Sequence, residues 1–307
     1  MNKIFVSIAC FMDNDIINTI NNCLENADNP EKIVFGICYQ YNPNSIEKNC
    51  LNPYENNKQF KIIKMHWKDA KGPAYARALI YDLFTDEDYY LQIDCHSRFY
   101  KHWDTKIIDC FQECKKRNEK TIISYYPINI LNMHEEKYQK TIVNISTIRS
   151  IDKNTGIKTH GRFIDVKNAP KTSWGISAAM LFFDKKAYTE VPFDKEIYHG
   201  LQFEEQVVLA ARYWTHGYDI FTPNQHILAT EYLTNVNRQK EKPIIHSNLK
   251  KETYNRLLHV MKLQYDEKYI HYNPKYIGSQ RSLLDYYKMF DNYYNEIKQI
   301  FTNNFID

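Results

Sequence analysis

The sequence is poor in the residues and motifs that mark several large classes of protein. Only 8 of its 307 residues are glycine, and it contains no Gly-x-Gly-x-x-Gly or Walker sequence. This argues against a dinucleotide cofactor and against the P-loop mode of ATP binding. No apolar run approaches about twenty residues, so no membrane-spanning helix is expected. The first residues, 1–8, lack the basic leader and the cleavage site of a signal peptide, and we expect a cytoplasmic protein.

The charge and the cysteine content narrow the class further. The formal net charge is only +3 and the lysines are dispersed, so no nucleic-acid partner is expected. The seven cysteines all lie between Cys10 and Cys114, and no two of them form a Cys-x-x-Cys pair. This pattern indicates reduced thiols rather than a disulfide framework or a zinc site. A hydrophobic content of 43% and a charged content of 25% are typical of a globular protein.

In the first 125 residues, apolar strand-like segments alternate with helical ones. We expect strands at residues 4–10, 33–39, 60–65, 89–93 and 121–125, and helices at 16–24, 74–84 and 103–117. A strand-helix-strand order predicts parallel strands joined by right-handed crossovers. The layout is therefore that of an α/β protein of the nucleotide-binding type.

The second part of the chain is less regular. The alternation breaks down over residues 129–171, where 141–145 has the pattern of a paired strand and 152–162 that of a polar loop. Further on, we expect a central strand at 174–183, a helix at 203–215, a short strand at 219–221, and helices at 256–263 and 283–301. No repeat or linker requires an independent second domain.

An acidic residue and a histidine follow the strand at 89–93. Side chains two apart in a strand point to the same side, so Asp94 and His96 are expected to project together from its carboxyl end. In open α/β sheets ligands bind at that end. A carboxylate oxygen beside an imidazole suits manganese or a similar divalent ion. The competing interpretation is an ordinary strand end entering a polar turn, which the spacing alone favours.

An arginine and a carboxylate add to this candidate site. Arg77 lies in the first turns of a helix that begins after Gly72-Pro73, and together with the helix N-terminus it suits a diphosphate. A surface arginine is the simpler alternative. Glu204-Glu205 opens another helix, a position that favours carboxylates through the helix dipole alone. In the functional interpretation, one of them binds an acceptor hydroxyl or assists proton transfer.

Several blocks of the sequence, in this order, resemble a known family. The blocks are Gly72 to Leu79, Tyr89 to Phe99 and Trp103-Asp104, with further similarity at 4–13, 27–40, 191–194, 203–217 and 278–286. They are similar to the signatures of the cytoplasmic polypeptide (hydroxyproline) N-acetylglucosaminyltransferases, glycosyltransferase family sixty. The resemblance covers most of the chain.

The resemblance implies a GT-A fold, with a mixed but mostly parallel sheet flanked by helices. It implies a catalytic domain over residues 1–238, and we expect residues 239–307 to be a helical C-terminal extension packed on it. It also implies a UDP-sugar donor and a divalent metal, with Mn²⁺ expected and Mg²⁺ as the alternative. The reaction would retain the anomeric configuration and move a sugar, first of all GlcNAc, to a hydroxyl on a protein or glycan. The oligomeric state stays open.

The resemblance also assigns roles to individual residues. Asp94 and His96 would bind the metal and the diphosphate, and Glu205 would be the catalytic carboxylate on the acceptor side, with Asp94 as its catalytic partner on the donor side. The expected donor-binding residues are Ala9, Phe11, Asp13, Arg77 and Asp94.

Two departures from the family pattern affect the site. The chain has Phe11-Met12-Asp13 where the family tends to have Tyr-Arg-Asp, and residues 227–232 lack the histidine that usually serves as a further metal ligand. We expect Glu231 to replace this ligand, with Thr230 as the weaker candidate. The departures favour, as an alternative function, a nucleotide-sugar or glycan-binding protein that has lost catalysis. A phosphatase or nuclease is disfavoured because no second acidic metal cluster is present.

Overall fold

The computed structural model describes residues 2–152, 156–193, 195, 205–232, 247–263, 265–272, 276–290, 294–295 and 297. The strands are β1 Ile4–Phe11, β2 Ile33–Tyr41, β3 Phe60–His66, β4 Tyr89–Asp94, β5 Ser97–Phe99, β6 Thr121–Ser124, β7 Ile128–Asn129, β8 Ile142–Asp152, β9 Gly156–Asp165, β10 Lys171–Ser173, β11 Met180–Asp184, β12 Asp219–Thr222 and β13 Leu228–Thr230. The α-helices are α1 Ile16–Glu25, α2 Pro73–Tyr81, α3 Trp103–Lys115, α4 Glu136–Lys140, α5 Lys185–Glu190, α7 Glu205–Thr215, α8 Ser247–Val260 and α10 Leu283–Lys288.

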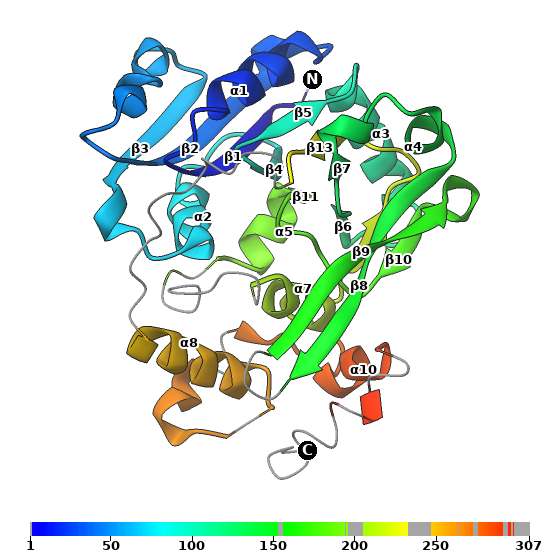
Figure 1. Ribbon diagram of the computed structural model, residues 1–307. Helices are drawn as coiled ribbons and strands as arrows, with labels where there is room; N and C mark the ends of the chain where they lie inside the picture. The colour runs from blue at the N-terminus through cyan, green and yellow to red at the C-terminus, as the bar shows by residue number, and fades with distance from the viewer. Residues whose placement is uncertain are drawn as a thin grey trace.

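The central sheet has eight strands in the order β10-β12-β6-β11-β4-β1-β2-β3 (Figure 1). Strands β4, β1, β2 and β3 run parallel, and β6 is parallel to β12. Strand β11 lies between β4 and β6 and is antiparallel to both, and β10 is antiparallel to β12. The expected mixed, mostly parallel α/β sheet is confirmed.

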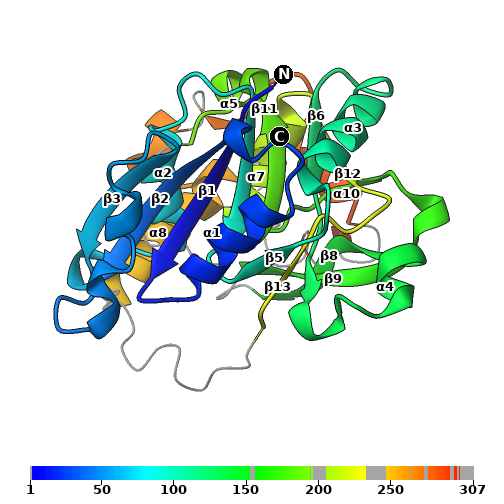
Figure 2. The same ribbon diagram turned by 90° about the horizontal axis from the view of Figure 1, so that it is seen from above.

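Helices cover both faces of this sheet. In β1, Phe5 contributes to the buried cluster that contains the apolar side chains of α2, α5 and α7. Ile4, Val6 and Ile8, which point to the opposite face of β1, pack with the apolar side chains of α1 and α3. Figure 2 shows α1 and α2 on opposite sides of the strands. Because both faces are covered, β1, β2 and β4 consist almost wholly of buried residues, and this is why the sequence shows uninterrupted apolar runs there.

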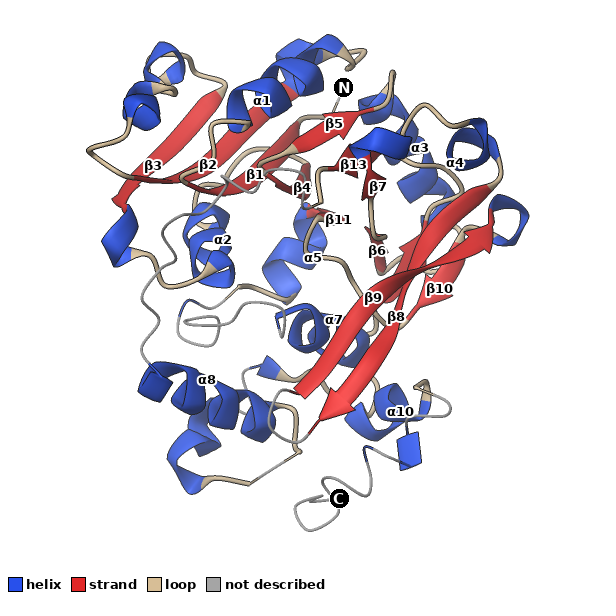
Figure 3. Cartoon of the chain, in the orientation of Figure 1, coloured by secondary structure: helices blue, strands red, loops and turns tan. Residues whose placement is uncertain are grey.

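Two smaller sheets lie beyond the carboxyl end of β4. Strand β13 pairs with β5 and β7, while β8 and β9 form a long hairpin (Figure 3). The expected polar loop at 152–162 is therefore wrong over most of its length. The hairpin has few apolar residues in β9, since many of its described side chains face water, so a strand there resembles a loop in sequence. The expected strand at 174–183 is confirmed only from Met180 onward.

The described C-terminal helices pack on α7. Leu257, Tyr286 and Tyr287 belong to the same buried cluster as the α7 side chains. The amide of Gly278 donates a hydrogen bond of 3.0 Å to the Thr215 hydroxyl at the end of α7. The expected boundary between residues 238 and 239 lies outside the described residues, so the division into 1–238 and 239–307 stays a prediction.

Two further expectations concern thiols and membranes. All seven cysteines are free thiols. Within the described part of the chain, no helix combines the length and the apolar character needed to cross a bilayer.

Candidate active site

The end of β1 places an acidic side chain against the end of β4. The parallel register sets Ala9 beside Asp94. Just after β1, Met12 has a φ of +47°, and its amide donates to the Gln40 carbonyl at 3.0 Å. This turn brings Asp13, which is only 8% exposed, to the carboxyl edge of the sheet. The end of β1 thus lies beside the end of β4, while donor-binding roles for Ala9, Phe11 and Asp13 stay predictions.

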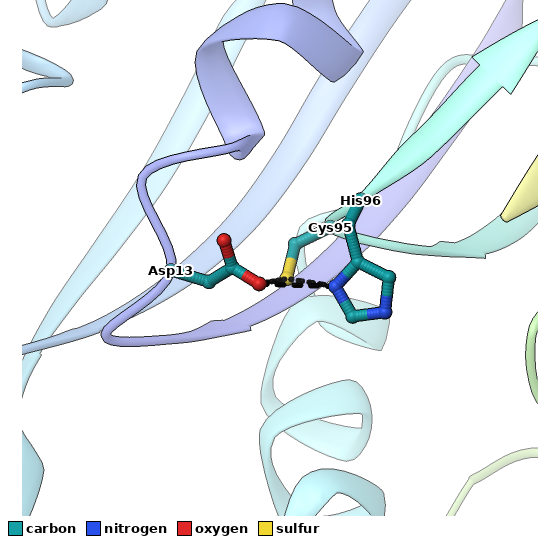
Figure 4. A group of neighbouring side chains, drawn as sticks. All are labelled: Asp13, Cys95 and His96. Carbon is teal, nitrogen blue, oxygen red and sulfur yellow. Dashed lines mark hydrogen bonds and ion pairs between the residues drawn. The ribbon is translucent and has the colours of Figure 1, made fainter. Parts of the chain in front are cut away.

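Asp13 contacts the histidine that follows β4. Its Oδ2 lies 3.0 Å from Nδ1 of His96 and 3.6 Å from Sγ of Cys95, and this Sγ lies 3.5 Å from the same Nδ1 (Figure 4). The second ring nitrogen of His96, Nε2, points away from Asp13 and Cys95 in Figure 4. The other carboxylate oxygen, Oδ1 of Asp13, accepts a hydrogen bond of 3.0 Å from the Asp15 amide, which fixes the carboxylate.

The surroundings change the acidity of these groups. Burial alone lowers the pKa of His96, but Cys95, Asp13 and Asp94 favour its charged form, and together they raise this pKa to about 11. A hydrogen bond with the Cys10 thiol, together with burial, raises the pKa of Cys95 well above its ordinary value. The pKa values of His96 and Cys95 are thus both raised from their ordinary values.

A second group of charges links β4 to α7. Nη2 of Arg77 donates to Oδ1 of Asp94 at 3.2 Å, and its Nη1 donates to Oε1 of Glu205. Arg77 is 6% and Glu205 2% exposed, whereas the Asp94 side chain is 25% exposed. Gly72, with a φ of +97°, and Pro73 begin α2 and so orient the helix that carries Arg77. The alternative of Arg77 as a surface arginine is wrong.

The ion pairs keep Arg77 charged despite its burial. Burial favours the neutral form of the guanidinium, but Glu205 and Asp94 outweigh it and raise the pKa of Arg77. One guanidinium thus joins two carboxylates that lie 111 residues apart in the sequence (205 minus 94). Arg77, Asp94 and Glu205, which were selected from the sequence as site residues, form one contiguous network.

Three polar side chains that the sequence analysis did not select border this network. The Tyr126 hydroxyl donates to Oε1 of Gln206 at 2.7 Å and lies 2.6 Å from the Thr159 hydroxyl. Burial first, and Asp94 in addition, raise the pKa of Tyr126. Tyr126 comes just after β6 and Gln206 just after Glu205, so a search for polar residues at strand ends and helix starts would have found both. Thr159 lies in the hairpin that was expected to be a loop.

The two candidates for a third metal ligand lie beside His96. The Glu231 amide donates to the His96 carbonyl at 3.0 Å, and the Thr230 hydroxyl lies 3.3 Å from the same oxygen. This proximity agrees with the expectation for Glu231, and its role as a ligand stays a prediction. His226 lies in the same region but is buried, and its Nε2 bonds the Ile142 carbonyl at 2.9 Å.

The contacts in the structure divide the expected Asp94 and His96 pair between two partners. Asp94 binds Arg77, and His96 binds Asp13. Within the described residues, a set of side chains able to hold a metal ion, with ligand atoms within 4.8 Å of one another, comprises Asp13, Cys95 and His96. Asp94 and Glu231 are not part of that set. Metal binding by Asp94, His96 and Glu231 therefore stays a prediction.

Solved structures share the fold of this chain. A structure of GalNAc-T7 with UDP, GalNAc and Mn²⁺ matches with a TM-score of 0.61 and 10% identity, over 99% of this chain and 55% of that one. Residues 1–349 of TarS from S. aureus match with UDP-GlcNAc bound (TM-score 0.51, 12% identity, 98% of this chain and 74% of that one). With UDP bound, the same protein gives a TM-score of 0.53 at 11% identity, over 96% and 72% of the two chains. The chain thus spans about half the length of GalNAc-T7, and these likenesses establish the GT-A fold.

Sequence comparison supplies the family. No curated protein matches the chain. The family model described as Glycosyltransferase (GlcNAc) matches residues 3–58 and 47–290, which include every residue of the charged network and of the Asp13, Cys95 and His96 set. The chain therefore belongs to the Glycosyltransferase (GlcNAc) family.

Proposed function

We propose that the protein is a metal-dependent, retaining glycosyltransferase that moves GlcNAc from UDP-GlcNAc to a hydroxyl of a protein or glycan. The observation that carries the proposal is the buried Asp94, Arg77 and Glu205 network beside the Asp13 and His96 pair, at the carboxyl edge of the sheet. The family match and a neighbour solved with UDP-GlcNAc support the donor. The sequence blocks that resemble the hydroxyproline-directed enzymes support a polypeptide acceptor, and the free thiols fit a reducing, cytoplasmic location.

The residues at the carboxyl edge of β4 fit a divalent metal ion. The partly exposed Asp94 carboxylate offers a hard oxygen, and Nε2 of His96 points away from Asp13. An oxygen and an imidazole nitrogen suit Mn²⁺, and Glu231 would add a second carboxylate. GalNAc-T7, a structural neighbour, was solved with Mn²⁺. A metal ion held there would neutralise the diphosphate as the glycosidic bond breaks.

Asp13 orients the histidine in this arrangement. Metal-binding histidines usually donate their other ring N–H to a carboxylate, which fixes the tautomer and the ring direction. The 3.0 Å contact between Nδ1 of His96 and Oδ2 of Asp13 has this form. Asp13 thereby leaves the lone pair on Nε2 once that nitrogen loses its proton. In this proposal Asp13 is a positioning residue.

Arg77 fixes the two carboxylates on either side of it. It binds Oδ1 of Asp94, whose side chain is 25% exposed, and this leaves Oδ2 as the oxygen for a metal ion. Two carboxylates and one guanidinium carry one net negative charge, which favours a divalent cation. Because both ion pairs are buried or partly buried, they are screened little by water.

Glu205 is the proposed acceptor-side carboxylate. It is the first residue of α7 and adjoins Gln206, which links it to Tyr126 and Thr159. A carboxylate can accept a hydrogen bond from an incoming hydroxyl and orient it. The polar groups of Tyr126, Thr159 and Gln206 supply hydrogen bonds to the rest of the acceptor or the sugar.

Turnover of the donor tests the proposal. The protein is incubated with Mn²⁺ and UDP-GlcNAc, and UDP release is followed with and without acceptors. Asp94→Asn is expected to lower release by at least about 100-fold while the protein stays folded, because the substitution removes the charged oxygen ligand. Asp109→Asn, an exposed acid on α3, is the matched control and is expected to match the wild type. Equal release by the Asp94 variant and the wild type would rule out the proposed metal site.

The second candidate function is nucleotide-sugar binding without catalysis. It is favoured by the ion pair between Arg77 and Glu205, which occupies the proposed acceptor carboxylate, and by Glu231 in place of a histidine. Saturable donor binding with no UDP release for any donor or acceptor would support this function instead.

A further inference from the structure

We propose that Asp13, Cys95 and His96 form a thiolate-containing site for a soft divalent cation such as Zn²⁺. The site differs from the proposed donor-side metal site in its ligands, since it uses Nδ1 of His96 and the Cys95 sulfur and does not use Asp94. It stands on its own geometry and does not depend on the proposed function.

The distances between the three ligand atoms match the edges of a zinc tetrahedron. With Zn–S of about 2.3 Å, Zn–N of about 2.0–2.1 Å and Zn–O of about 2.1 Å, tetrahedral angles give edges of about 3.6 Å for S–N and S–O and about 3.4 Å for N–O. The structure has 3.5 Å for Sγ to Nδ1, 3.6 Å for Sγ to Oδ2 and 3.0 Å for Nδ1 to Oδ2. The sulfur edges need almost no change. The distance between Nδ1 and Oδ2 increases by about 0.4 Å, because the hydrogen bond between these atoms is replaced by one metal bond to each of them.

The shell around the three ligands holds them in place. Oδ1 of Asp13 is fixed by the Asp15 amide, so Oδ2 keeps its direction towards the set. The His96 carbonyl is fixed by the Glu231 amide. Such outer hydrogen bonds orient metal ligands and strengthen binding.

An ion can reach this set and find a fourth ligand there. The His96 side chain is 24% exposed, whereas Asp13 and Cys95 are 8% and 6% exposed, so the ring side is the entry path. A water molecule entering from the ring side would supply the fourth ligand. The Cys10 thiol, which lies 3.1 Å from the Asp13 carbonyl and is hydrogen-bonded to Cys95, provides a nearby second sulfur.

The ligand types decide which ion this set prefers. A thiolate is a soft ligand that Zn²⁺ and Co²⁺ accept, whereas Mn²⁺ and Mg²⁺ prefer oxygen ligands and come lower in the affinity order. Binding replaces the S–H bond of Cys95 with a metal–sulfur bond and any proton on Nδ1 of His96 with a metal–nitrogen bond, and the released protons go to solvent. The imidazole keeps its proton on Nε2.

The proton on Nε2 affects the proposed donor-side metal site, and this consequence rests on the proposed function. A protonated Nε2 has no lone pair for the donor-side metal ion. Zn²⁺ in the Asp13, Cys95 and His96 set and Mn²⁺ on Nε2 therefore exclude each other at His96. Zn²⁺ is then an inhibitor of the Mn²⁺-supported reaction.

Cobalt is the direct probe, because thiolate ligation gives Co²⁺ a charge-transfer band in the near ultraviolet. Equimolar Co²⁺ is added to the full, metal-free chain without any sugar donor. We expect the band, and we expect Zn²⁺ to displace it. Cys95→Ser is expected to remove the band and to weaken Zn²⁺ binding by about 100-fold or more. Cys50→Ser is the control, because Cys50 is half-buried in the loop between β2 and β3 and is not one of the three ligands, and both properties should stay unchanged.

A second variant covers the case in which Cys95→Ser does not fold. His96→Gln keeps the thiol, changes a partly exposed side chain, and is expected to weaken Zn²⁺ binding to the same degree. A wild-type chain without the band, or a band that survives in a folded Cys95→Ser variant, would overturn the site. UDP release with Mn²⁺ is measured separately, so a chain that turns over donor but lacks the band refutes the zinc site alone.

Discussion

Removal of the Arg77 guanidinium tests whether Glu205 and Asp94 need this positive charge in order to stay ionised in the folded protein without a loss of stability. Arg77→Met keeps much of the side-chain volume and deletes the charge. It leaves Glu205, which is 2% exposed, as a buried carboxylate without its arginine partner. It also frees Asp94, whose side chain is 25% exposed and can be hydrated. Breaking a buried ion pair from one side lowers the free energy of unfolding by about 3–5 kcal/mol, and Glu205 supplies most of this loss.

A second substitution separates charge from packing. In the double variant Arg77→Met with Glu205→Gln, the buried charge is gone, so we expect more than half of the lost stability to return. Arg98→Met is the matched control. Like Arg77, Arg98 donates two hydrogen bonds to carboxylate oxygens. Both of its bonds go to Asp15, at 2.7 and 3.0 Å, and its side chain is 21% exposed. Its loss is expected to lower stability by only about 1 kcal/mol.

Urea unfolding followed by circular dichroism measures these effects through the midpoint and slope of the transition. The expected order of stability is wild type, then Arg98→Met, then the double variant, then Arg77→Met. A loss below about 1 kcal/mol in Arg77→Met, or a double variant less stable than Arg77→Met, would refute the claim that Glu205 depends on Arg77 for its charge.

The remaining predictions concern pH, packing and metal affinity. Burial lowers the pKa of His226 to about 4, so the unfolded chain, with a histidine pKa of about 6.5, binds the proton first. Stability should be complete above about pH 6.5 and fall by up to about 3 kcal/mol towards pH 4, a slope that His226→Gln should flatten in urea unfolding. Gly36→Ala would place a Cβ 2.0 Å from the Phe5 ring, and we expect a loss of about 1–3 kcal/mol in the same assay. Asp13→Asn is expected to weaken Mn²⁺ binding by about 10–100-fold through the misoriented His96 ring, as measured by titration calorimetry, whereas unchanged affinity would exclude the positioning role.

The sequence predicted the sheet and the region of the site because both follow from local patterns. The apolar runs of β1 and β4 and the helix of Arg77 are local signals, and parallel pairing then brings Ala9 beside Asp94. The C-terminal edge of the sheet was therefore identified correctly as the place of the polar residues. Individual residues such as Arg77, Asp94 and Glu205 were found through the family resemblance as well as through their positions.

The partners of these residues were not predictable from local patterns. Asp94 and His96 would share one side only in a strand that runs through both, but β4 ends at Asp94 and the chain turns before His96. Asp94 meets Arg77, and His96 meets Asp13, through tertiary packing. The place of Thr159 beside Tyr126 and Gln206 was missed because the hairpin that carries it is polar.

One measurement tests the central claim most directly. Metal-free protein is given Mn²⁺ and, in parallel, UDP-GlcNAc, UDP-glucose or UDP-galactose, with hydroxyproline peptides and glycans as acceptors, and the products are followed by NMR. The proposed function predicts UDP release and transfer from UDP-GlcNAc with the anomeric configuration retained, dependent on the metal and abolished in Asp94→Asn. No release or transfer from any of the three donors with any acceptor would contradict it.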